Sequence, residues 1–154
     1  VYDMFKDKID INKINNDGNT VLMLALEHSN IQIVKFLYKI FKDHIDFNKQ
    51  NYNGDTSLML AIQNKNVEVT KYVIRKFKDE INISKQNKNG DTALMLAIQK
   101  SNSDIIQSIS FTFKDEIDIN KHNKDGKTAL MLATDDGVKN YLSYVFKERL
   151  KTNK

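Results

Sequence analysis

The chain contains no cysteine, no proline and no tryptophan among its 154 residues. The absence of cysteine excludes disulfide scaffolds, thiol nucleophiles and zinc sites built on cysteine. Long hydrophobic runs are also missing, because the longest have six residues, as at 21–26, and a membrane-spanning helix needs about 20. The first residues do not resemble a signal peptide. These absences predict an intracellular, cytoplasmic location.

Three residue types dominate the composition: 22 Lys, 18 Asn and 17 Ile make up over a third of the chain. Such a bias is typical of proteins from A/T-rich genomes and indicates no particular chemistry. Hydrophobic residues make up 40% and charged residues 29%, the balance of a soluble globular chain. The net charge of +4 is compatible with nucleic acid or an acidic protein as a partner. Whether the positive charges lie on the expected binding surface decides between these partners and others.

The sequence repeats itself with a period of 36 residues, as Gly18, Gly54, Gly90 and Gly126 show. Each glycine lies in a segment that reads N-x-x-G-x-T, and each segment is followed by the word Leu-Met-Leu-Ala. A third word, Phe-Lys-Asp, recurs at 5–7, 41–43, 77–79 and 113–115. Four copies in register predict a repeat architecture.

Each unit reads as a tight turn followed by two helices. The Asp-Gly or Asn-Gly steps favour a hairpin-like turn, and the following Thr is suited to cap a first helix that carries Leu-Met-Leu-Ala. In the first unit a second helix is expected from about Ile31, with apolar residues at helical spacing up to Phe41. A single unit cannot bury both apolar stripes, so units must stack. The sequence therefore predicts an all-α solenoid of helix-turn-helix units with hairpin-like loops.

These words resemble the ankyrin repeat, whose signature T-P-L-H-x-A is matched by T-V-L-M-L-A from Thr20 and by close variants from Thr56, Thr92 and Thr128. The resemblance implies a single ankyrin-repeat domain over residues 1–154. Its parts would be a partial upstream repeat at 1–14, full repeats at 15–50, 51–86 and 87–122, and a C-terminal capping repeat at 123–154. It also implies a non-catalytic module that binds another protein through a concave surface.

The chain departs from the family pattern in its hairpins. Met23, Met59, Met95 and Met131 replace the signature histidine, and Val21, Ser57, Ala93 and Ala129 replace its proline. In the family that imidazole hydrogen-bonds neighbouring turns, whereas a methionine offers only packing. We therefore expect looser hairpins.

The period of 36 residues also exceeds the usual value of about 33. The extra residues fall between Tyr38 and Asp46, which predicts a second helix longer by nearly one turn. Phe41, Phe77 and Phe113 would continue its apolar stripe.

The two ends of the array differ from the middle. In the last unit Gly137, Tyr141-Leu142 and Val145-Phe146 have the spacing of an ordinary family repeat, and the polar residues 147–151 suggest a capping helix. At the other end, residues 1–5 align with the second helix of a unit, so the chain is expected to begin within an upstream repeat. Residues 1–12 should therefore be the least stable part of the array.

No residue pattern indicates catalysis. There is no glycine-rich phosphate-binding motif, and His28, His44 and His122 occupy different places in their units, unlike a metal set. The acidic pairs Asp79-Glu80 and Asp115-Glu116 share one repeat position, which favours a structural role, and we expect a contact or solubility role for the unrepeated pair Asp135-Asp136. The chain is thus predicted to be no enzyme and to need no cofactor or metal.

Two alternatives stay open: a targeting or spacer part of a larger enzyme or of a secreted or viral effector, and a basic convex face that binds an anionic surface.

The placement of charge argues against nucleic acid as the partner. Positions expected on the concave side carry a net charge of −3, so the basic excess lies on second helices and loops, at residues such as Lys35, Lys39, Lys71 and Arg75. We predict a monomer that binds another protein. The predicted contact residues lie at hairpin tips and first-helix ends: His28, Tyr52, Asn53, Asp55, Lys88, Asp91, Lys100, His122, Lys124 and Lys127.

Overall fold

A computed structural model describes residue 5 and residues 8–150 of the chain. Its described part contains eight helices in four successive pairs. The first helices of the pairs are α1 (Val21–Glu27), α3 (Ser57–Gln63), α5 (Ala93–Gln99) and α7 (Ala129–Leu132). The second helices are α2 (Ile31–Phe41), α4 (Val67–Lys76), α6 (Ser103–Thr112) and α8 (Asp136–Val145).

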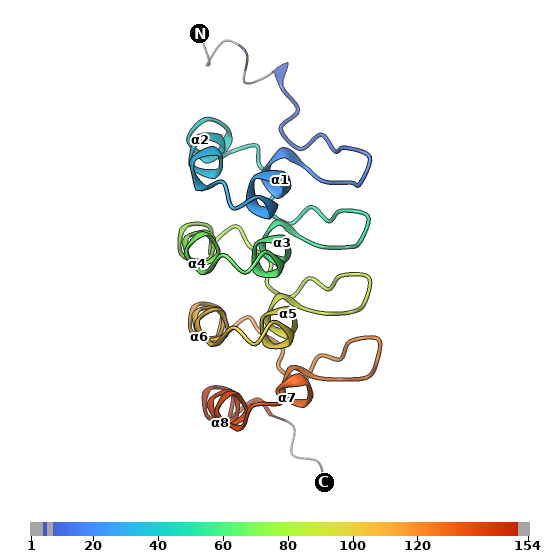
Figure 1. Cartoon of the computed structure of the whole chain (residues 1–154), viewed down its shortest axis with the longest axis vertical. Helices are drawn as coiled ribbons and strands as arrows, with labels where there is room; N and C mark the ends of the chain where they lie inside the picture. The colour runs from blue at the N-terminus through green and yellow to red at the C-terminus, as the bar shows by residue number, and fades with distance from the viewer. Residues whose placement is uncertain (1–4, 6–7, 151–154) are drawn as a thin grey trace.

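The pairs stack into an elongated array with two helical layers (Figure 1). The inner layer holds α1, α3, α5 and α7, the outer layer holds α2, α4, α6 and α8, and the connecting hairpins project away from the outer layer. This arrangement confirms the predicted all-α repeat fold. None of the helices in the described residues is long and apolar enough to cross a membrane.

Polar caps decide where the helices begin. Thr20 caps α1 by accepting a hydrogen bond from the Met23 amide at 3.3 Å, and the threonine before each later inner helix does the same. Asn30, Asn66, Asn102 and Asp135 cap the outer helices in the same way. Each cap satisfies an amide that has no partner within its helix, so the repeated sequence words fix repeated helix starts.

Stacking buries the methionine of each inner helix until the array ends. Met23, Met59 and Met95 are at most 1% exposed, because the next pair of helices covers them. Met131 is 60% exposed. Residues 147–150 form turns and a bend after α8 rather than the expected capping helix, and residue 151 of that prediction lies outside the described residues.

The phenylalanines predicted to extend the outer helices are buried, as Phe41, Phe77 and Phe113 are at most 7% exposed. However, Phe41 is the last residue of α2, while Phe77 and Phe113 directly follow α4 and α6. The amide of the residue four positions later donates to each phenylalanine carbonyl at 3.0–3.1 Å. Most of the inserted residues thus form a closing turn, and the apolar stripe continues past the helix through the phenylalanine and the isoleucine four positions later, which is buried at Ile81 and Ile117.

The last unit is shorter because its inner helix is shorter. The helix α7 has 4 residues against 7 in α1, α3 and α5, whereas α8 has 10 residues like α4 and α6. Asp135 caps α8 and Phe146 follows it, as Asn102 and Phe113 do for α6. The family-spacing alignment through Gly137 is therefore wrong, since Gly137 is the second residue of α8.

The expected upstream repeat at residues 1–14 falls partly outside the described residues. In the described segment 8–14 the chain forms turns rather than a continuous α-helix. Ile11 is buried there and belongs to the hydrophobic core.

Candidate functional site

The hairpins form a row along the side of the array opposite the outer helices (Figure 1). Each hairpin closes on its first asparagine: the side-chain oxygen of Asn51, for example, accepts from the Asn53 and Asp55 amides, both at 2.9 Å. The glycine that follows has a positive φ of 72–80°, a conformation that costs other residues free energy. The Asn-x-x-Gly word thus specifies the turn.

Neighbouring hairpins are joined through their backbones. The amides of Tyr52, Lys88 and Lys124 donate to carbonyls of the preceding hairpin at 3.1, 2.9 and 2.9 Å. This approach needs glycine, because a Cβ atom on Gly54 would lie 2.7 Å from the Lys88 nitrogen. Gly18, Gly54 and Gly90 therefore serve both the turn and the close contact between turns, whereas Gly126 serves the turn alone.

A second row of hydrogen bonds joins the same hairpins through side chains, and we call it the asparagine ladder. In it, the first asparagine of one hairpin donates to a side-chain oxygen of the hairpin before it. The bonds run from Asn51 to Asn19 at 2.8 Å, from Asn87 to Asp55 at 3.0 Å and from Asn123 to Asp91 at 2.9 Å. The ladder supplies bonds between turns where the family's histidine would give them, which favours firmer hairpins than the sequence alone predicts.

The ladder also changes the set of residues available to a partner. Asp55 and Asp91 are 5% and 4% exposed and accept ladder bonds, so the prediction that they contact a partner is corrected by their burial. The other predicted contact residues are all exposed: His28, Tyr52, Asn53, Lys88, Lys100, His122, Lys124 and Lys127. His28 and Lys100 are the C-caps of α1 and α5, and the remaining six lie on the hairpins.

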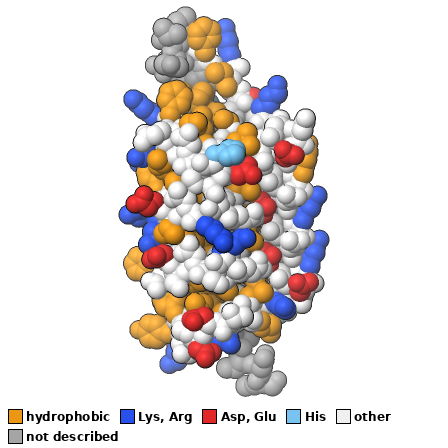
Figure 2. Space-filling model, viewed as in Figure 1, with side chains coloured by type: hydrophobic (Ala, Val, Ile, Leu, Met, Phe, Trp, Pro, Cys, Tyr) orange, Lys and Arg blue, Asp and Glu red, His pale blue; other side chains and the backbone are white. Residues whose placement is uncertain are grey.

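The charged side chains form no patch of one sign on the face shown in Figure 2, where acidic and basic groups are interspersed. On the outer side, Lys71 pairs with Asp104 at 3.1 Å and Arg149 with Asp115 at 3.2 Å, and both pairs join neighbouring units. Within the described residues no three His, Asp or Glu side chains are placed to hold a metal ion. The surface therefore offers mixed polar contacts.

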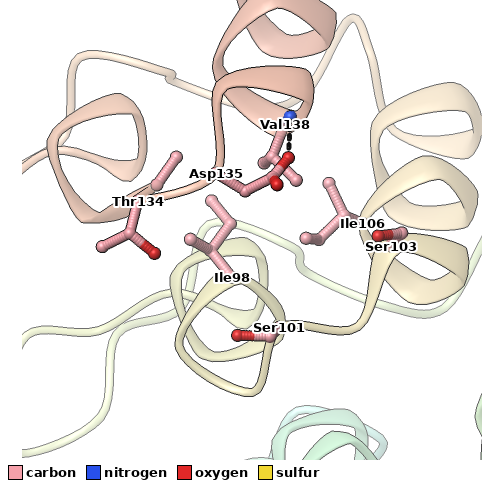
Figure 3. Close-up of a pocket in the computed structure, with 8 residues that line it drawn as sticks. Ile98, Ser101, Ser103, Ile106, Thr134, Asp135 and Val138 are labelled. Carbon is pink, nitrogen blue, oxygen red and sulfur yellow. Dashed lines mark hydrogen bonds between the residues drawn. The ribbon is translucent and has the colours of Figure 1, made fainter.

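The shortened α7 leaves a pocket of about 270 Å³ beside the turn between α5 and α6 (Figure 3). Its lining residues are Ile98, Ser101, Ser103, Ile106, Ala133, Thr134, Asp135 and Val138. Sequence reasoning missed both this pocket and the asparagine ladder. The asparagine that opens every N-x-x-G-x-T segment pointed to the ladder, and the shorter last unit pointed to the pocket. Neither feature can be predicted without knowing how the neighbouring unit stacks on it.

Comparison with known families agrees with the geometry. The family profile described as ankyrin repeats (3 copies) matches residues 2–85, 38–123 and 78–154, in overlapping stretches that span nearly the whole chain. A comparison with curated proteins finds no match. Stacked helix pairs, projecting hairpins and the profile match together place the chain in the ankyrin-repeat family.

Proposed function

We propose that the chain is one non-catalytic, monomeric domain, residues 1–154, that binds another protein through its concave surface. This surface consists of the hairpin residues Tyr52, Asn53, Lys88, His122, Lys124 and Lys127 together with the inner-helix ends at His28 and Lys100. Ankyrin repeats are in general protein–protein interaction modules. Repeat arrays commonly use such extended concave surfaces for binding.

The observation that carries this proposal is the combination of fixed hairpins with exposed tips. Backbone bonds and the asparagine ladder hold each hairpin to the one before it, while Tyr52 at a tip is 56% exposed. A surface that is already ordered loses little conformational entropy when a partner binds. The array therefore supports rigid display of side chains.

Tyr52 and Lys88 are the central contacts of this proposal. Tyr52 lies against the preceding hairpin, since a Cβ atom on Gly18 would come within 2.8 Å of its ring, so one part of the ring packs on the hairpin while the rest stays exposed. Tyrosine is enriched among residues that dominate binding energy. Lys88 occupies the same repeat position as Tyr52 in the next unit, which places the two side by side along the row.

The test compares two double variants of the full chain. Tyr52→Ser with Lys88→Ser alters the concave surface, and Tyr144→Ser with Lys147→Ser makes the same exchanges on the exposed outer side. Affinity capture with mass spectrometry identifies proteins bound by the unmodified chain, and titration calorimetry on each purified partner measures Kd. We expect the concave variant to weaken binding at least about 30-fold and the outer variant to stay within about twofold. Equal losses, or a loss confined to the outer variant, would refute the concave assignment.

A further inference from the structure

The pocket beside α7 exists because one helical turn is missing there. In the first two units the same place is filled: Asn64, the C-cap of α3, donates to the Leu26 carbonyl at 3.3 Å and to the Ser29 hydroxyl at 2.5 Å. The inner helix α7 ends three residues earlier than α3 relative to its capping threonine. Among the described residues, no side chain of the last unit makes the equivalent hydrogen bond to the turn at Ser101.

The floor of the pocket is apolar. Figure 3 shows the side chains of Ile98, Ile106 and Val138 directed toward one another from α5, α6 and α8. The hydroxyl-bearing residues Ser101, Ser103 and Thr134 also line the pocket. The volume of about 270 Å³ lies just below the roughly 300–1,000 Å³ of small-molecule sites, so a single side chain fits better than a cofactor.

One carboxylate lies over this floor. Asp135 accepts a hydrogen bond from the Val138 amide at 2.9 Å through one oxygen, which leaves the second oxygen available beside the pocket (Figure 3). A Cβ atom on Gly137 would lie 2.9 Å from that bonded oxygen, so glycine gives the carboxylate room. Among the described residues no Lys or Arg nitrogen lies within 4.0 Å of Asp135, and Lys139 instead approaches Asp136 at 3.8 Å.

We propose that this pocket binds one lysine or arginine side chain of the protein partner. The aliphatic stem would cover Ile98, Ile106 and Val138, and the cationic head would meet the free oxygen of Asp135. Long basic side chains combine an apolar stem with a charged end in this way, and a charged hydrogen bond to a carboxylate is stronger than a neutral one. The inference rests on the proposed protein-binding function and adds a specific anchor to it.

The first experiment titrates small probes into the ¹⁵N-labelled full chain and follows amide shifts by NMR. N-acetyl-lysine N-methylamide and its arginine counterpart should produce saturable shifts at the amides of Ser103, Thr134 and Val138. N-acetyl-norleucine N-methylamide carries the same stem without the charge and should bind at least about tenfold more weakly. Equal binding of the norleucine probe, or shifts centred elsewhere, would overturn the assignment. If putrescine binds more than about tenfold tighter than the lysine probe, the ligand of the pocket is a free polyamine and the proposed side-chain ligand is overturned.

The second experiment uses a matched pair of variants. Asp135→Asn keeps a good capping residue for α8 and removes the charge, and we expect it to weaken lysine-probe binding at least about tenfold. Asp136→Asn removes a charge one residue away that does not line the pocket and should change binding less than about twofold. Unchanged binding in Asp135→Asn, with an unaltered melting temperature, would refute the proposal. The two proposals fail separately. If the double variant of Tyr52 and Lys88 loses the protein partner but the unmodified chain does not bind the lysine probe, only the pocket proposal is refuted. If that double variant still binds the partner, the concave assignment is refuted.

Discussion

The asparagine ladder makes a quantitative prediction at Asn87. Its side-chain oxygen accepts from the Asn89 and Asp91 amides, both at 3.0 Å, and its side-chain nitrogen donates to Asp55 at 3.0 Å. Each bond contributes about 0.5–1.5 kcal/mol, and a buried acceptor left without its donor costs about 1–3 kcal/mol more. Asp55 is such an acceptor, being 5% exposed. Adding the three bonds and the unpaired acceptor, we expect Asn87→Ala to lower the free energy of unfolding by about 2.5–7.5 kcal/mol.

Urea unfolding followed by circular dichroism measures this loss, with the slope m checked for constancy. Asn15→Ala is the matched control, because Asn15 accepts the same two turn bonds at 3.0 and 2.9 Å but gives no ladder bond to another hairpin in the described part of the chain. For these two bonds the expected cost of Asn15→Ala is about 1–3 kcal/mol. In an Asp55→Ala background the cost of Asn87→Ala should fall by at least about 1 kcal/mol. The role of the ladder would be refuted if Asn87→Ala and Asn15→Ala lowered the free energy of unfolding equally and if the effects of Asn87→Ala and Asp55→Ala were strictly additive.

Two further pairs of variants test the stacking. Met95→Ala removes a side chain that is 1% exposed and should cost about 2–5 kcal/mol, whereas Met131→Ala at the open end should change the stability by no more than about 0.5 kcal/mol; similar costs in thermal unfolding would contradict an open end. Gly54→Ala meets the Lys88 nitrogen at 2.7 Å and Gly126→Ala meets nothing within 4 Å, although both have positive φ. Both should lose about 1–2 kcal/mol to backbone strain, and only Gly54→Ala should lose clearly more, which the same unfolding experiment would show.

Short sequence motifs predicted where the helices begin, because contacts between neighbouring residues determine the helix starts. The threonine before each Leu-Met-Leu-Ala word accepts a hydrogen bond from an amide three residues later, so the helix start depends on neighbouring residues alone. Asp55 shows the limit of that reasoning. A polar residue at a hairpin reads as exposed, yet Asn87, 32 residues away, buries it, and this contact exists only in the stacked array.

The last unit shows a second limit. Its three missing residues could be removed from either helix without disturbing the repeat words, so spacing alone did not decide between the alternatives. Packing decides: with Asp135 as the cap, Val138, Leu142 and Phe146 fall on one helical face against the core. Because the inner helix α7 is the shortened one, the pocket forms beside it. The family-spacing alignment placed the missing residues in the outer helix, so it did not predict the pocket.

The central claim is that the hairpins are held rigidly while their tips remain exposed. Native-state hydrogen exchange of the Lys88 and Lys124 amides, which donate across hairpins at 2.9 Å, tests this claim most directly. We predict exchange at least about 1,000-fold slower than in an unstructured chain, which corresponds to an opening free energy of about 4 kcal/mol. Exchange within about tenfold of the unstructured rate would show that the hairpins open freely and would contradict rigid display.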